Sequence, residues 1–285
     1  MNYIKTGILL IMLTMLFIWI GGYFGGQMGA VYAFIFAVIM NLGAYWFSDK
    51  IVLSMYKAKE VTKEENPEFY NIVMELTANA KLPMPKLYIT PQSSPNAFAT
   101  GRDPRHAAIC VTQGIWRLLD RDELRGVIAH ELSHIKNRDT LIMTVTATIA
   151  GAITMLATWA RWAAIFGGFG GRGGRSRDSN IFGYLFMLIV APIAAMLIQL
   201  AISRSREYAA DKRGAYISKN PAGLANALLK LEKSARAYPM QASHNTAHLF
   251  IVNPLSGKGF QALFSTHPPV QERVQRLRDM NINNR

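Results

Sequence analysis

The feature that most constrains this chain is a set of four long hydrophobic stretches that contain no charged residue. An α-helix needs about 20 apolar residues to cross the hydrocarbon core of a bilayer, and each stretch is close to that length. Trp19, Tyr23 and Trp46 lie near the ends of the first two stretches, where interfacial aromatic residues are expected. We therefore expect four transmembrane helices, at residues 7–24, 29–47, 142–160 and 181–202.

Alternatives remain open for both pairs of stretches. The first follows Lys5 and resembles a signal peptide, although its apolar run is longer than usual and a second stretch follows at once. The last two are also compatible with a re-entrant hairpin. Buried helices of a soluble core are a further alternative, but such helices are rarely so long and so free of charge.

The distribution of positive charge predicts which side of the membrane each segment occupies. Lys50, Lys57 and further lysines follow the second stretch, and the tail from residue 203 is rich in Arg and Lys. Because positive residues favour the cytoplasmic side, we expect both termini and residues 48–141 in the cytoplasm. The Gly-rich loop at residues 167–180 carries three arginines and conflicts with this topology.

The net charge of +13 is compatible with nucleic-acid binding, but the sequence contains no basic helix, zinc-finger spacing or aromatic RNA-binding motif. Basic residues that flank membrane spans explain the charge better, so we expect the lipid bilayer as a partner and no nucleic acid. The single cysteine, Cys110, excludes an intramolecular disulfide.

The polar segment between the second and third stretches predicts a small α+β unit. Asn66 and Pro67 are typical of a helix start, and Asp120 with Glu123 forms a capping-box pattern at the start of a later helix. Short β-prone runs bounded by Pro and Gly lie between them. We expect helices at residues 67–80 and 121–138 and strands at residues 86–90, 96–100 and 107–112.

The second of these helices carries the motif His130-Glu131-Leu132-Ser133-His134, which matches H-E-x-x-H. Two imidazoles one helical turn apart project from the same face and can bind one Zn²⁺. Glu131 then lies beside the metal, where it can take a proton from bound water. An exposed helix with two incidental histidines is the alternative, but the apolar residues around the motif favour a packed helix.

A catalytic zinc site needs a third protein ligand and one open position. The motif helix ends just before the third hydrophobic stretch, and Glu207 and Asp211 follow just after the fourth, so an antiparallel pair of spans returns them to the same membrane face. We predict Glu207 as the third ligand and Asp211 as an acceptor for a ligand histidine. Surface carboxylates neutralised by Arg204 and Arg206 are the alternative.

At these residues the sequence closely resembles the HtpX family of membrane-bound zinc proteases, which is related to the prenyl-protein (CAAX) endopeptidases. The resemblance extends over nearly the whole chain, from the paired N-terminal stretches to the C-terminal segment. The residues that carry it are Pro95-Asn96-Ala97-Phe98-Ala99-Thr100-Gly101, the motif at residues 130–134, the segment at residues 207–211, Ser265-Thr266-His267-Pro268-Pro269 and Glu272-Arg273.

The resemblance implies further roles. His267 is expected to donate to the oxyanion during catalysis, and Arg273 to bind substrate, although a structural salt bridge explains Arg273 equally well. An edge strand with Asn96, Ala97, Phe98 and Ala99 is expected to pair with the substrate backbone. The implied substrates are unfolded, misfolded or damaged membrane proteins of the bacterial inner membrane, cut at its cytoplasmic face.

Together these expectations give a mainly α membrane protein with four transmembrane helices and a cytoplasmic α+β zincin-like metalloprotease domain with a small sheet. A zinc-binding transporter or scaffold without protease activity, and a CAAX-type endopeptidase, are the alternative functions. The expected parts are two spans at residues 1–47, a protease part with the H-E-x-x-H helix at 48–141, a hairpin at 142–202, and a protease part with the third ligand at 203–285.

Overall fold

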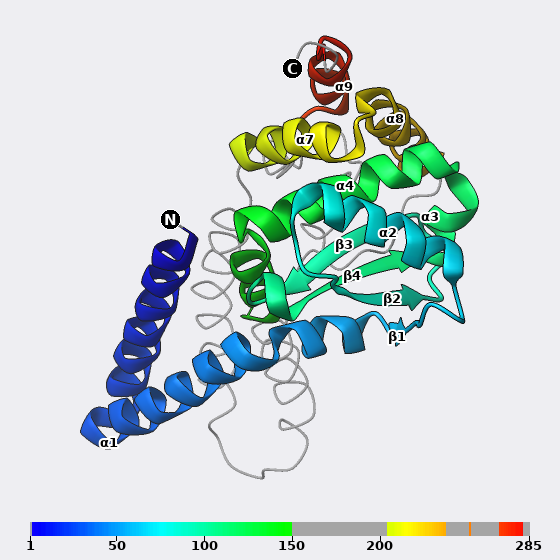
Figure 1. Ribbon diagram of the computed structural model, residues 1–285. Helices are drawn as coiled ribbons and strands as arrows, with labels where there is room; N and C mark the ends of the chain where they lie inside the picture. The colour runs from blue at the N-terminus through cyan, green and yellow to red at the C-terminus, as the bar shows by residue number, and fades with distance from the viewer. Residues whose placement is uncertain (1, 150–203, 238–250, 252–267, 282–285) are drawn as a thin grey trace.

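The computed structural model describes residues 2–149, 204–237, 251 and 268–281 (Figure 1). The fourth expected span, most of the third, the Gly-rich loop and His267 lie outside these residues. Within them the chain is mostly helical with one small sheet.

The first two hydrophobic stretches form one long element, α1 (Asn2–Met55), which bends sharply at Gly26. Gly26 has φ 60° and ψ −152°, a conformation open to glycine because it lacks a Cβ. Two parts of α1, Thr6–Tyr23 and Gly25–Met55, are long and apolar enough to span a membrane. Asn41 Nδ2 donates to Thr14 Oγ1 at 2.8 Å and so joins the two halves. The expectation of two N-terminal apolar helices therefore agrees with the structure.

The sheet has four strands in the order β1-β2-β4-β3. The pairing of β2 with β4 is parallel and the other two pairings are antiparallel. Among the described residues β3 is the last strand in this order, so it is an edge strand. The three expected strands are present, with β3 shifted by one residue, whereas β1 is too short for a sequence pattern to reveal. The bounds are β1 (Lys59–Glu60), β2 (Lys86–Thr90), β3 (Ala97–Gly101) and β4 (Ala107–Thr112).

Two helices begin at the residues that their capping patterns indicate. Asn66 Oδ1 accepts from the backbone N–H of Phe69 at the start of α2 (Pro67–Ala80), and Asp120 and Glu123 form a complete capping box at the start of α4 (Arg121–Asn137). The other helical elements within the described residues are η1 (Pro104–His106), α3 (Gln113–Leu118), Thr140–Ile149, α7 (Arg204–Ser218), α8 (Pro221–Ala237) and α9 (Val270–Arg278).

Helix α4 lies at the centre of the fold. It packs against α2, against β3, and against α7 and α8, which lie above it in Figure 1. Along β3 and β4 the buried side chains alternate, so that Ala97, Ala99 and Ile109 join the core around α4. Phe98 and Cys110 pack on the other face against Val52, Leu53 and Tyr56 near the end of α1.

Helix α7 approaches α4 closely at Gly214. A Cβ atom at this position would lie 2.9 Å from the backbone N of His130 and 3.0 Å from its Cα. Because both neighbours are backbone atoms, any larger residue would push the two helices apart. Glycine at this position therefore allows α7 to lie directly on the turn of α4 that carries the motif.

Candidate metal centre

The two motif histidines project from one face of α4 and meet at their Nε2 atoms, which are 3.2 Å apart. Both side chains are buried, as expected for residues on the packed side of a central helix. Their positions follow from the helix itself, since residues at i and i+4 lie one above the other. The motif therefore presents two nitrogen atoms to one point in the interior.

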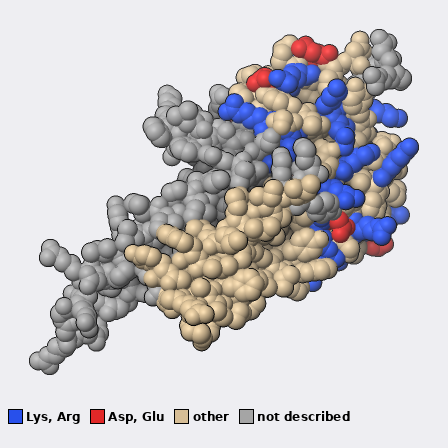
Figure 2. Space-filling view, turned by 90° about the vertical axis from the view of Figure 1, so that its left-hand side faces the viewer, with Lys and Arg blue, Asp and Glu red and all other residues tan. Residues whose placement is uncertain are grey.

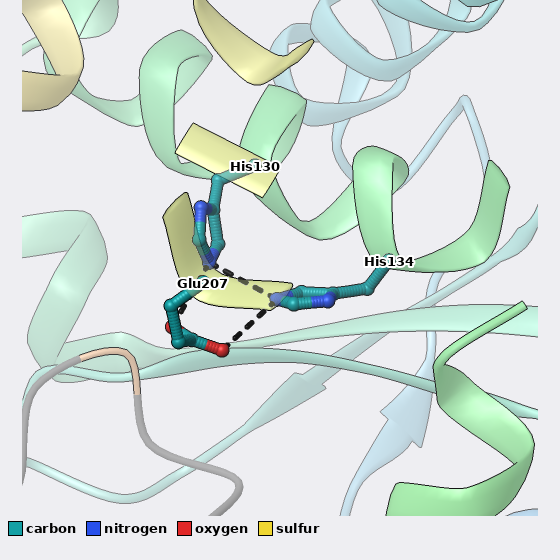
Figure 3. A group of neighbouring side chains, drawn as sticks. All are labelled: His130, His134 and Glu207. Atoms are coloured by element: carbon teal, nitrogen blue, oxygen red, sulfur yellow. Dashed lines mark hydrogen bonds and ion pairs between the residues drawn. The ribbon is translucent and has the colours of Figure 1, made fainter. Parts of the chain in front are cut away.

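Helix α7 adds a carboxylate at the same point (Figure 3). Glu207 Oε2 lies 3.7 Å from His130 Nε2, and Glu207 Oε1 lies 3.5 Å from His134 Nε2. Zinc bonds of about 2.0–2.1 Å in a tetrahedral arrangement place ligand atoms about 3.3–3.4 Å apart. Because the three observed separations are close to that value, these residues fit a zinc ion. The structure thus brings together all three predicted ligands, although they are far apart in the sequence.

A chain of polar contacts fixes the His130 ring from behind. His130 Nδ1 lies 2.9 Å from Asp211 Oδ1, and Arg273 on α9 donates to both oxygens of Asp211 at 2.7 and 2.8 Å. Arg273 also donates to the carbonyl of Ile251 at 2.8 Å. Burial opposes ionisation of Asp211, but the charge of Arg273 and its hydrogen bonds lower the pKa of this carboxyl below its ordinary value.

The second histidine has its own carboxylate partner, Asp139, which the sequence did not reveal. His134 Nδ1 lies 3.2 Å from Asp139 Oδ2, and both side chains are buried. Arg138 adopts a left-handed conformation with φ 58° at the end of α4 and thereby turns the chain back towards His134. An acidic residue that directly follows the end of a motif helix was the available signal.

Glu131 lies between the metal cluster and the sheet. Its Oε2 accepts a hydrogen bond from the backbone N–H of Ala99 in β3 at 2.8 Å. Burial raises the pKa of Glu131 above its ordinary value, and the charge of Glu207 adds to this rise, whereas the two histidines oppose it. A carboxylate with a raised pKa is suited to accept and release a proton near neutral pH.

The protonation of His134 also differs from that of an exposed imidazole. Burial lowers its pKa, but the hydrogen bond with Asp139 and the charges of Glu207 and Glu131 outweigh burial and raise the pKa to about 9. The metal-free site therefore attracts positive charge, and a cation such as Zn²⁺ would displace the proton of His134.

The other predicted site residues lie at different places around the cluster. Arg273 is fully buried, and its contacts with Asp211 correspond to the structural salt bridge rather than to a group open to substrate. Asn96 is buried too, and its Oδ1 accepts from the backbone N–H of Ile251 at 3.4 Å. Phe98 packs on the far face of the sheet, so any contact of β3 with substrate would be made by its backbone.

Two histidines one turn apart and a carboxylate from a second helix could hold a zinc ion and would leave a fourth position for water, a ligand set that is typical of metallopeptidases. Residues 63–281 match the model described as Peptidase family M48. The chain belongs to this family, and within it to the HtpX proteases.

Similar proteins cover nearly the full length of the chain. "Protease HtpX homolog" of Syntrophobacter fumaroxidans is 56% identical over 277 residues, which cover 97% of this chain and 98% of that protein. A protein of the same name from Thermococcus sibiricus is 53% identical over 282 residues, which cover 99% of this chain and 97% of that protein. These similarities agree with the family that the motifs indicate.

The solved structures include one of similar fold, described as "Crystal Structure of S. mikatae Ste24p". It aligns with a TM-score of 0.52 at 20% sequence identity, over 96% of this chain and 63% of that chain. The chain therefore spans less than two thirds of the length of Ste24p. At this identity the likeness supports the fold alone.

Proposed function

We propose that the chain is a zinc endopeptidase of the bacterial inner membrane that cuts unfolded or damaged membrane proteins at the cytoplasmic face. The observation that carries this proposal is the position of Glu131, which lies beside the His130, His134 and Glu207 cluster and bonds to the edge strand β3. Metal ligands, a proton acceptor and a sheet edge that can hold a peptide are thus within a few ångströms of one another.

Zinc bound by the three ligands would polarise the scissile carbonyl and lower the pKa of water in the open position. Glu131 would accept a proton as the water oxygen adds to the carbonyl carbon, and would return it to the leaving amine as the C–N bond breaks. The contact with Ala99 orients the Glu131 carboxylate, and the Asp211 and Asp139 contacts hold the rings of His130 and His134 in place. His267, by resemblance to the family, would donate to the oxyanion.

The substrate would bind as an extended strand along β3. In the part of the chain that the structure describes, no further strand pairs with the outer edge of β3, whose Ala99 N–H donates to Glu131. The other backbone groups of this edge can pair with a peptide, and binding by strand addition selects extended chain over folded protein. All five residues of β3 are buried, so the strand would contact a peptide through its backbone, which supports broad sequence preference. Unfolded segments of membrane proteins meet these requirements.

Placement in the membrane is supported by the two apolar parts of α1, whose side chains, including Ile39 and Phe47, are largely exposed. Lysines after residue 48 favour the cytoplasmic side for the sheet and the metal cluster. Four spans, with the last two formed by residues 142–202, remain our proposal for the complete topology.

A Glu131→Gln variant tests the proposal. The full chain is purified in detergent with a chelator, reloaded with zinc and incubated with an unfolded protein substrate. We expect wild-type protein to bind one zinc ion and to cut the substrate, and Glu131→Gln to bind zinc without cutting it. Glu68→Gln, an exposed position on α2, is the matched control and should cut at the wild-type rate.

Three outcomes would contradict the proposal. Undiminished cleavage by Glu131→Gln would remove Glu131 from its role as base. Zinc binding by the wild-type chain without cleavage of any substrate would favour the transporter or scaffold alternative. Cuts confined to a site beside a lipidated cysteine would favour the CAAX-type alternative.

A further inference from the structure

The outer edge of β3 passes directly beside Glu131. The carbonyl of Asn96 accepts from the N–H of Thr112 at 2.9 Å, so by strand alternation the backbone groups of Phe98 also face β4. The N–H of Ala99 faces the other way and reaches Glu131. A peptide added to this edge would therefore pass the proton acceptor at the position of Ala99.

One end of β3 contacts the part of α1 that would lie at the membrane surface. Arg102 follows the last residue of β3, and its guanidinium carbon lies 4.7 Å from the ring centroid of Trp46. Trp46 is half exposed and lies at the end of an apolar run, just before the first charged residues, Asp49 and Lys50. Tryptophan at such a position marks the headgroup layer, and an arginine beside it can extend its charge into that layer.

The distribution of charge agrees with this assignment. Figure 2, in which the left-hand side of Figure 1 faces the viewer, shows an uncharged area and, beside it, an area where Lys and Arg side chains gather. Arg102 and Trp46 meet where the apolar run of α1 gives way to charged residues. We therefore take their contact as the level of the headgroups.

Packing, rather than a linker, sets the height of β3 relative to α1. Helix α1 continues without interruption from Trp46 to Met55, and the ring of Tyr56 lies 4.9 Å from that of Phe98 in β3. On the same face, Thr100 Oγ1 lies 3.1 Å from Thr144 Oγ1 in the apolar helix Thr140–Ile149. β3 is thus fixed to two helices that begin or end in the predicted membrane region.

The distance from the headgroup level to Glu131 follows from strand geometry. Ala99 and Arg102 are three residues apart, and an extended chain rises about 3.3 Å per residue, so their backbones are at most about 10 Å apart. A substrate strand that leaves the membrane beside Arg102 would reach Glu131 after about three or four residues.

We propose that this fixed separation makes the enzyme depth-limited: it cuts membrane-anchored chains within the first few extended residues that emerge from the headgroup layer. The inference rests on the proposed peptidase function and adds a class of substrate segment, a polar stretch that directly follows a transmembrane helix. Anchoring also raises the effective concentration of such a segment at β3 compared with the same sequence free in solution.

The position of Arg102 can be measured without any cleavage assay. An Arg102→Cys variant of the full chain is spin-labelled in lipid vesicles, and the accessibility of the label to oxygen and to a water-soluble nickel reagent gives its depth. Cys110 stays unlabelled because it is buried and because burial raises the pKa of its thiol to about 12. We expect a headgroup-level label at Arg102→Cys and a water-level label at Glu68→Cys. Equal, fully aqueous labels at both positions would overturn the inference while leaving the proposed function intact.

The cleavage pattern tests the functional consequence. The substrate is a single transmembrane helix followed by a long stretch of one repeated cleavable unit, so that every distance from the membrane offers the same sequence. With zinc-loaded enzyme in vesicles, we expect cuts to cluster in the units next to the helix. The soluble repeat without the helix is the control and should be cut throughout, at a rate at least about tenfold lower.

Each other pattern has a definite meaning. Cuts spread evenly along the anchored repeat would overturn the depth limit but not the peptidase. Absence of cuts in both substrates would overturn the proposed function and this inference with it.

Discussion

Replacement of Arg273 by Met tests how the site is supported from behind. The guanidinium is fully buried and makes three hydrogen bonds, two to Asp211 and one to the carbonyl of Ile251. Methionine keeps much of the length of the side chain but removes the charge. Asp211 would then be left as a buried carboxylate without its main counter-charge, beside the ring of His130.

The expected effect is large because one partner of a buried ion pair is removed while the other remains. Such changes cost about 3–5 kcal/mol of folding free energy. For a chain of this size that corresponds to a fall in Tm of about 6–20 °C. Arg273 holds Asp211 in place, and Asp211 is the acceptor that orients the ring of His130. Loss of Arg273 should therefore also weaken zinc binding, by about 10–100-fold.

Thermal unfolding of the detergent-purified protein and competition with a zinc chelator measure the two effects. Arg278→Met, in the last turn of α9, is the matched control, because Arg278 is exposed on the same helix. Its Tm should change by no more than about 2 °C, since substitutions at exposed positions usually change the free energy of unfolding by no more than about 0.5 kcal/mol.

A double variant, Asp211→Asn with Arg273→Met, separates stability from metal binding. The double variant has no unpaired buried charge at these two positions, so its Tm should recover most of the loss seen in Arg273→Met. Zinc affinity should stay low because His130 still lacks a charged acceptor. Wild-type Tm and zinc affinity in Arg273→Met alone would refute the reasoning.

Three further outcomes are expected. Gly214→Ala should weaken zinc binding and lower the free energy of unfolding by about 1–3 kcal/mol, since its Cβ would press on the backbone of His130. Gly43→Ala is the control, because a Cβ at this position would meet no atom within 4 Å. Equal zinc affinity in the two variants would contradict the close packing at Gly214. Asp139→Ala should lower zinc affinity by about 10–100-fold in chelator competition, because the ring of His134 loses its acceptor; unchanged affinity would argue against that contact. Apparent zinc affinity should rise with pH, by up to about tenfold per unit, until about pH 9, because zinc must displace the proton that His134 retains through its raised pKa. The same proton stabilises the metal-free fold. This contribution to the free energy of unfolding is fully present below pH 6.5 and is lost as pH rises through 9. A flat affinity between pH 6.5 and 9 would contradict the raised pKa.

Local patterns predicted the elements that carry the metal ligands. Capping residues gave the starts of α2 and α4, and the i, i+4 spacing of His130 and His134 fixed their common direction. These features depend on residues within one or two helical turns. The pairing of Glu207 with the motif is long-range, but it was predictable because chain reversal between two apolar stretches restricts where the carboxylate can return.

Contacts that depend on tertiary packing were beyond the sequence. The ion pair between Asp211 and Arg273 joins helices α7 and α9, and the resemblance alone left the role of Arg273 open. The approach of Asp139 to His134 depends on the left-handed Arg138, which no local propensity indicated. β1 has only two residues, so it produced no pattern long enough to recognise.

The central claim is that Glu207 from α7 completes a zinc site with the two histidines of α4. Zinc K-edge X-ray absorption on the purified full chain measures it directly. We predict one zinc ion per chain with two imidazole nitrogens and low-atomic-number oxygen ligands at about 2.0–2.2 Å, and loss of stoichiometric zinc in Glu207→Ala. Full zinc occupancy with an unchanged spectrum in Glu207→Ala would contradict the claim.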